Sequence, residues 1–222
     1  MAWDIRRCDE VDSTNHVCKT LAAQGADNTA VIARRQTAGK GRLGRSFLSP
    51  EGGLYLSVLW RGCPAGQLLT VTPLAAVAVC RAIEQTCGAM CGIKWCNDVV
   101  LNGKKLCGIL TESSLRPDGG AEWLVVGIGV NVAQTAFPPD IADMAASLAM
   151  QGYSVSPDAL AEVLAESPAS CWKMGNCQVL PDSRSMRPTS STAAVSSPTI
   201  SAAPRPIQSP TWWRRRGRPE AV

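Results

Sequence analysis

The dipeptide Asn102-Gly103 lies between two apolar runs in the stretch CGIKWCNDVVLNGKKLCGILTESS, residues 91–114. Asn-Gly in this setting is the strongest short signal for a two-residue β-hairpin, because both residues readily adopt the positive φ angles that the turn requires. The two strands of a hairpin run antiparallel. The chain is therefore expected to contain a sheet with antiparallel neighbours.

Further strands and helices are expected before residue 178. Buried strands are predicted from apolar or β-branched runs at residues 29–35, 53–60 and 122–132. Helices are predicted at residues 12–25, from about Pro73 to Gly88, and at 157–172. These mixed elements predict an α+β (mixed α/β) fold, in which helices pack on a central mixed, largely antiparallel sheet.

The composition changes at about residue 178. Pro, Ser, Thr and Arg supply 26 of the last 42 residues, and no apolar periodicity remains there. Such a segment buries too little apolar surface to offset its ordering entropy, so we expect a folded domain at 1–177 and a disordered tail at 178–222. The net charge is +4 overall but −1 without the last 42 residues. A near-neutral body argues against a design for binding DNA.

Cysteines, histidine and apolar runs limit the cellular setting. Ten cysteines occur without a C-x-x-C pair, and His16 is the only histidine, so a zinc site has little to build on. The N-terminus lacks an apolar signal region, and the longest apolar run, residues 68–80, is shorter than the about 20 residues that span a bilayer. We therefore expect a cytoplasmic protein with reduced thiols and no membrane partner.

The segment ARRQTAGKGRLGRSF, residues 33–47, interleaves five cationic residues with three glycines. Glycines let successive backbone N–H groups point into one concavity, and arginine forks match the oxygens of phosphate or carboxylate groups. The segment is not a Walker A loop, because no Ser or Thr follows Lys40. A solvated basic loop is the simpler interpretation of this stretch by itself.

A second cluster, KWCND at residues 94–98, is followed by KKLCGIL at residues 104–110. It places a carboxylate and several lysines near one sheet edge, as expected for an ATP site with Asp98 on magnesium and a lysine on developing negative charge. Lys104 and Lys105 point to opposite faces of a strand, so only one can enter such a site. Alternation with the neighbouring apolar residues does not choose between them.

Two weaker motifs complete the set. GIGVN at residues 127–131 ends a strand with glycines that permit a flat ligand to approach, and Asn131 offers both a donor and an acceptor. STN at residues 13–15 can bind a ligand or simply cap a helix. Each motif by itself favours the structural interpretation.

Together the motifs DSTN, QTAGKGRLGR, SPEGGLYLSV, KWCND with KKLCGIL, and GIGVN, in this order and spacing, resemble biotin–protein ligases. The resemblance covers residue 11 to about residue 150. It implies the catalytic domain shared by biotin and lipoate ligases, which is similar to class II aminoacyl-tRNA synthetases. Because the motifs begin at residue 12, the monofunctional kind without an N-terminal repressor domain is expected.

The resemblance also implies a reaction and its partners. A biotin–protein ligase uses ATP and Mg²⁺ to convert biotin to biotinyl-5′-AMP, and then transfers biotin to a lysine of a biotin carboxyl carrier protein or domain. Cations and N–H groups are needed because a carboxylate must approach a phosphate. Family members occur as monomers and as homodimers, so both states remain open.

Roles for individual residues follow from the same resemblance. Lys105 matches the catalytic lysine, and Arg42 matches the position closest to the activated carboxyl-phosphate. Biotin binding is implied for Ser13, Thr14, Asn15, Gln36, Gly39, Lys40, Gly41, Arg42, Lys105 and Gly108. ATP binding is implied for Arg42, Arg45, Asn97, Asp98 and Asn131, with Asp98 as the magnesium ligand.

The C-terminal part departs from the family. The pattern of a helix followed by a small SH3-like domain ends after about residue 166, and the Pro/Ser/Arg-rich tail at 178–222 takes its place, as an altered reading frame would produce. The alternatives are a related lipoyl or octanoyl ligase and a catalytically impaired relic that binds biotin. A different class, a single-stranded nucleic-acid-binding protein that uses the basic loop and the tail, is a further alternative.

Overall fold

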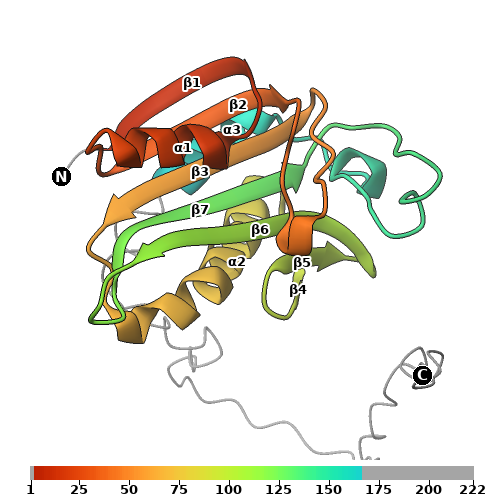
Figure 1. Cartoon of the computed structure of the whole chain (residues 1–222). Helices are drawn as coiled ribbons and strands as arrows, with labels where there is room; N and C mark the ends of the chain where they lie inside the picture. Colours follow the sequence, from red (N-terminus) through yellow and green to blue (C-terminus); the bar gives the residue numbers. More distant parts are fainter. Residues whose placement is uncertain (1–2, 167–222) are drawn as a thin grey trace, which may run out of the picture. The chain divides into compact units, whose positions relative to one another are not determined.

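The computed structural model describes residues 3–166, and within them seven strands form one sheet (Figure 1). The strands are β1 (Asp4–Val11), β2 (Thr29–Gln36), β3 (Gly53–Arg61), β4 (Gly92–Lys94), β5 (Asp98–Leu101), β6 (Lys104–Leu115) and β7 (Ala121–Asn131). Their spatial order is β1-β2-β3-β7-β6-β5-β4. Only β1 and β2 are parallel neighbours within this described part, so the predicted mixed, largely antiparallel sheet is confirmed.

Helices cover both faces of the sheet (Figure 1). The described helices are α1 (Thr14–Ala23), α2 (Ala65–Cys87) and α3 (Pro157–Glu166), with short 3-10 turns η1 (Arg42–Gly44) and η2 (Ala149–Gln151). Helix α1 packs on β2, β3 and β7 from one side, while α2 and α3 pack on the other. Strand β3 is covered on both faces, which explains why all residues of GLYLSVLW are buried and why, apart from Ser57, the stretch does not alternate between apolar and polar residues.

The Asn102-Gly103 hairpin is present as predicted. Asn102 has φ 50° and Gly103 has φ 79°, and they join β5 to β6 in antiparallel register. The strand register changes inside this hairpin, because Val99 pairs with Cys107 but Val100 pairs with Lys105. One extra residue of β6 is therefore accommodated between these pairs as a β-bulge.

Helix α2 is longer than the sequence predicts. The prediction placed its start at about Pro73, but the helix begins at Ala65 and contains Pro73 in its interior. Pro73 removes the hydrogen bond to the carbonyl of Leu69, whose side chain is 90% exposed, so this carbonyl is on the solvent side of the helix. The predicted end at Gly88 is confirmed, with Gly88 in the left-handed conformation.

The length and composition of α2 would also allow it to cross a membrane. Its buried residues include Val71, Val79 and Ile83, and they pack against α3, β6 and β7. This arrangement is that of a core helix that lies on a sheet. The apolar run identified from the sequence, residues 68–80, is therefore shorter than the helix that contains it.

At both ends of the described residues the structure and the sequence-based prediction can be compared. Strand β1 was not predicted, because its sequence DIRRCDEV is mostly charged and exposed, as suits an edge strand. Of the helix predicted at 157–172, residues 157–166 form α3 and the rest lie outside the described residues. The proposed tail at 178–222 also lies outside them.

Candidate functional site

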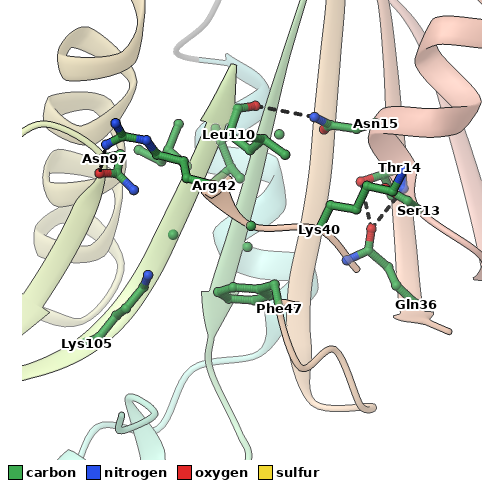
Figure 2. Close-up of a pocket in the computed structure, with 16 residues that line it drawn as sticks. Ser13, Thr14, Asn15, Gln36, Lys40, Arg42, Phe47, Asn97, Lys105 and Leu110 are labelled. Carbon is green, nitrogen blue, oxygen red and sulfur yellow. Dashed lines mark hydrogen bonds between the residues drawn. The ribbon is translucent and has the colours of Figure 1, made fainter. Parts of the chain in front are cut away.

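A small cleft of about 50 Å³ lies on the α1 side of the sheet, where α1 begins and β2 ends (Figure 2). It is formed by α1, β2, the loop between β2 and β3, the β4–β5 turn, β6 and β7. Ten residues named from the sequence line it: Ser13, Thr14, Asn15, Gln36, Lys40, Gly41, Arg42, Asn97, Lys105 and Gly108. Segments nearly 100 positions apart in the sequence thus meet at one place.

One end of the cleft is polar. Gln36 Oε1 accepts hydrogen bonds from the backbone nitrogen of Thr14 at 2.8 Å and from Thr14 Oγ1 at 3.1 Å. Gln36 Nε2 donates to Ser49 Oγ at 2.8 Å, and Ser49 Oγ donates to the carbonyl of Phe47 at 2.9 Å. The start of α1 and the glycine–arginine loop are therefore connected through Gln36.

Asn15 continues this polar end onto the sheet. Its side chain is almost wholly buried and contacts Ser57 and Glu112, neither of which was named from the sequence. Gly127 lies directly beneath it, and a Cβ at this position would collide with the Asn15 amide. Glycine in β7 is therefore needed to seat an internal side chain.

A pair of glycines forms the middle of the cleft floor. Gly108 and Gly129 are direct partners across β6 and β7, and the Phe47 ring lies over both of them. Figure 2 shows the Phe47 ring between the two ends of the cleft. The ring also contacts Tyr55 edge-to-face, with 6.5 Å between the ring centroids. An aromatic ring on a cross-strand glycine pair replaces the missing side-chain packing. The loop after β2 is thus anchored on the sheet through Phe47.

The opposite end of the cleft is cationic (Figure 2). Arg42 Nη1 donates to Asn97 Oδ1 at 2.7 Å and lies 4.0 Å from Cys96 Sγ. Lys105 Nζ forms an ion pair with Asp98 Oδ1 at 2.8 Å. The glycine–arginine loop therefore contacts the KWCND turn, and both predicted cations lie beside it.

The β-bulge decides which of the two adjacent lysines enters the cleft. Leu106 is the extra residue, so Leu106 and Cys107 are both buried and Lys105 lies on the same face as Gly108. The Lys105 backbone is hydrogen-bonded on its other side to Met144 and Ala146, at 2.8 and 3.0 Å. Lys104 turns away and donates to the carbonyl of Ala142. This geometry agrees with the family resemblance, which implied Lys105 and not Lys104.

Four residues named from the sequence do not line the cleft. Gly39 lies behind it, where a Cβ would collide with the Phe47 carbonyl, and Arg45 is exposed on the loop. Asp98 lies beside the cleft, paired with Lys105. Asn131 is buried and donates to the carbonyl of Ala146 at 3.2 Å. Their predicted ligand contacts remain predictions.

The glycines of the loop between β2 and β3 also match the spacing of a known nucleotide-binding motif. Residues 39–44, GKGRLG, match the spacing G-x-G-x-x-G of dinucleotide-binding turns. That motif requires a strand, a turn and a long helix leading to a parallel strand. Here the turn leads through the three-residue η1 to β3, which is antiparallel to β2. A dinucleotide-binding turn is therefore excluded at this position.

No group of three or more His, Cys, Asp or Glu side chains converges to hold a metal ion within residues 3–166. Asp98 accepts hydrogen bonds at Oδ1 from Lys105 and from Asn97 Nδ2, the latter at 2.9 Å. Magnesium in nucleotide sites is commonly held by one or two carboxylates together with substrate phosphates. Asp98 fits this limited role but not that of a protein-only metal site.

Comparison with known proteins places these features in a family. The Biotin/lipoate A/B protein ligase family matches residues 8–131. A bifunctional ligase/repressor BirA from Bacillus spizizenii is 41% identical over 145 residues, which cover 63% of this chain and 44% of that protein. A biotin--[acetyl-CoA-carboxylase] ligase from Paracoccus denitrificans is 37% identical over 163 residues, which cover 69% of this chain and 67% of that protein.

A solved structure agrees with the sequence comparisons. The biotin protein ligase from Aquifex aeolicus in complex with biotin and ATP superposes with a TM-score of 0.64 and 34% identity, covering 73% of this chain and 67% of that chain. This chain belongs to the biotin/lipoate A/B protein ligase family, and the predicted resemblance to biotin–protein ligases is confirmed. The chain spans less than half the length of the Bacillus relative.

Proposed function

We propose that the chain is a biotin–protein ligase, which activates biotin with ATP to biotinyl-5′-AMP and transfers the biotinyl group to a lysine of a carrier domain. The observation that carries the proposal is that one and the same cleft has a polar end at Thr14 and Gln36 and a cationic end at Arg42 and Lys105. Biotin has a matching polarity, with a ureido ring at one end and a carboxylate at the other. The ligands of the Aquifex relative support the same assignment.

Activation joins two anions, and the cationic end supports this step. A carboxylate oxygen of biotin attacks the α-phosphorus of ATP, a new C–O–P bond forms, and pyrophosphate leaves with the electrons of the broken P–O bond. Lys105 and Arg42 reduce the repulsion between the reacting anions and stabilise the charge that develops. Transfer follows when a lysine amine of the carrier attacks the biotinyl carbonyl, and AMP leaves.

The loop between β2 and β3 must open for this reaction. A volume of about 50 Å³ is far below the roughly 300 Å³ or more that small-molecule sites usually offer. The loop is held on the sheet by the Phe47 ring and by the Arg42–Asn97 hydrogen bond. Opening at these two contacts admits the substrates, and closure over the reactive adenylate excludes water.

Magnesium would accompany ATP in this site, held mainly by phosphate oxygens with Asp98 as the available carboxylate. Asp98 is paired with Lys105 in this structure, so binding of the ion would release the Lys105 amine toward the phosphates. The carrier is proposed to be the biotin carboxyl carrier domain of a carboxylase such as the one named for the Paracoccus relative. Action in the cytoplasm is a further part of this proposal.

The purified full chain tests the proposal directly. A biotin carboxyl carrier domain is incubated with the chain, biotin and MgATP, and biotin incorporation is measured by streptavidin blot and mass spectrometry. Incorporation that requires ATP is the expected result, and incorporation of lipoate in place of biotin would contradict the proposed substrate. Binding of biotin without any transfer would support the impaired relic instead.

A Lys105→Ala variant tests the proposed catalytic residue. It is expected to abolish adenylate formation while biotin binding stays measurable, because the lysine lies at the cationic end and not at the polar end. Pyrophosphate release in the presence of biotin is the assay, and Lys104→Ala is the matched control because its amine turns away from the cleft. Normal pyrophosphate release by Lys105→Ala would remove this residue from catalysis.

A further inference from the structure

Asn15 forms one wall of the cleft, and its amide contacts the Leu110 carbonyl (Figure 2). Together with Glu112 and Ser57, this carbonyl holds the amide in one orientation. Its Nδ2 donates to the Leu110 carbonyl at 3.3 Å and to Glu112 Oε2 at 2.8 Å, while its Oδ1 lies 2.6 Å from Ser57 Oγ. The carbonyl and the ionised carboxylate only accept hydrogen bonds, so the nitrogen must face them. Ser57 Oγ then donates its proton to Asn15 Oδ1.

The single proton of Ser57 determines what Thr14 presents to the cleft. Ser57 Oγ also lies 2.7 Å from Thr14 Oγ1, but its proton is used by Asn15, whose oxygen has none to offer. The Thr14 hydroxyl proton then goes to one of two internal acceptors, Ser57 Oγ or Gln36 Oε1. In both arrangements Thr14 Oγ1 presents lone pairs to the cleft, and a ligand N–H group is its matching partner.

Glu112 stands at the far end of this chain of hydrogen bonds, outside the cleft lining. It follows Leu110 by two residues on β6, and its Oε1 accepts from Lys19 Nζ at 2.8 Å. Lys19 comes one helical turn after Asn15 in α1, so it lies on the same helix face. Although burial opposes ionisation, the hydrogen bonds from Lys19 and Asn15 hold the pKa of Glu112 below its usual value. The carboxylate is therefore a permanent acceptor at neutral pH.

We propose that Glu112 is a positioning residue for ligand recognition: it fixes the Asn15 amide and, through Ser57, makes Thr14 an acceptor for a ureido N–H group. The inference rests on the proposed biotin site. It explains why that site would prefer a ligand with N–H donors. In Glu112→Gln, Lys19 keeps the amide oxygen of the new side chain on its own side, so the NH₂ group faces Asn15. The Leu110 carbonyl, at 3.3 Å, is then the remaining acceptor for Asn15 Nδ2, and the proposal is that this single longer contact does not prevent the Asn15 amide from reversing. The Ser57 proton then goes to Thr14, and Thr14 loses acceptor capacity toward the cleft.

The test compares biotin with an analogue that is methylated on the ureido nitrogens and cannot donate there. Dissociation constants of both compounds are measured by calorimetry on the full chain, and the ratio of the two constants is the readout. The wild-type protein is expected to prefer biotin, and Glu112→Gln is expected to reduce this preference about tenfold, as for the loss of one hydrogen bond. The dissociation constant of ATP is expected to stay within about twofold, because Glu112 is remote from the cationic end.

Two further variants separate positioning from folding. Lys19→Gln keeps the carboxylate acceptor and is expected to retain the preference for biotin. Glu122→Gln is the matched control, because Glu122 pairs with Arg61 at 3.5 Å on the same sheet but away from the cleft, and it is expected to change nothing. An unchanged preference in Glu112→Gln would overturn the proposal.

Other outcomes are equally decisive. Equal weakening of biotin and of the methylated analogue in Glu112→Gln, with a lower melting temperature, would show that Glu112 only supports the fold. If the wild-type protein binds biotin but does not discriminate against the methylated analogue, the positioning role fails while the proposed function stands. If the wild-type protein binds neither compound, the proposed function fails, and the positioning role fails with it.

Discussion

Replacement of Gly129 by alanine is expected to destabilise the protein by displacing Phe47. The added Cβ would lie 2.5, 2.9 and 3.0 Å from three carbons of the Phe47 ring, where ordinary contacts begin at about 3.4 Å. The ring must therefore retreat from the glycine pair. Overpacking of this kind costs roughly 1–3 kcal/mol, and alanine in a strand recovers roughly 0.5–1 kcal/mol relative to glycine. The expected net loss is about 1 kcal/mol.

Thermal unfolding measures this loss. For a folded domain of this size, 1 kcal/mol corresponds to a shift of about 2–4 °C in melting temperature. Gly66→Ala in α2 is the matched control, because a Cβ at Gly66 meets nothing within 4 Å. Its expected effect is a gain of up to about 1 kcal/mol from helix propensity.

A rise in melting temperature for Gly129→Ala similar to that for Gly66→Ala would refute the reasoning, because it would mean that the ring is not seated on the glycine pair. The displaced ring should also loosen the loop that it anchors, since the Phe47 backbone nitrogen donates to the Gly39 carbonyl at 2.9 Å. Faster escape of biotinyl-5′-AMP from the variant, measured by filtration after a single turnover, is the functional sign of that change.

The remaining predictions concern the loop, the acid response and the thiols. Arg42→Gly removes the hydrogen bond to Asn97, so free biotinyl-5′-AMP is expected to accumulate in solution; no increase over wild type would contradict the lid role. Because folding lowers the pKa of Glu112 from 4.5, its contribution to stability is present above about pH 4.5 and is lost as the pH falls through the folded value. The unfolding free energies of wild type and Glu112→Gln should therefore differ at pH 7 and converge once the pH falls below the folded pKa of Glu112. Burial raises the pKa of Cys18 to about 12, so maleimide should label the half-buried Cys96 before the buried Cys18, as peptide mapping would show.

The sequence predicts the elements near the cleft better than it predicts their register. Local signals such as Asn102-Gly103 and Gly88 identify the turn and the helix end, because a positive φ is a local requirement that favours a few residue types. The choice between Lys104 and Lys105 is different. It depends on the extra residue Leu106, and simple alternation cannot reveal a bulge. Only the family resemblance selected Lys105.

Other features depend on contacts between distant segments. Glu112 lies in LTESS near the end of a strand, where a polar residue normally faces solvent, and nothing nearby in the sequence points to Asn15, 97 positions away. Strand β1 is hard to recognise because its charges are satisfied across the strand pair, as in the Glu10–Arg35 ion pair at 2.6 Å. This pairing also explains why Arg35, at the edge of the basic stretch, lies outside the cleft.

The glycines connect these observations. On the α1 face of the sheet, Gly108, Gly127 and Gly129 leave a floor without side chains, and Asn15 and Phe47 enter this space from α1 and from the loop. Two side chains with different roles therefore pack on this floor. Asn15 forms a fixed polar wall, whereas the Phe47 ring must move when ligand binds. A methyl group on Gly127 would disturb the polar wall, and one on Gly129 would disturb the ring. A substitution at Gly127 should thus weaken biotin recognition, and one at Gly129 should weaken retention of the adenylate. If the loop acted by charge alone, the two substitutions would not have separate effects.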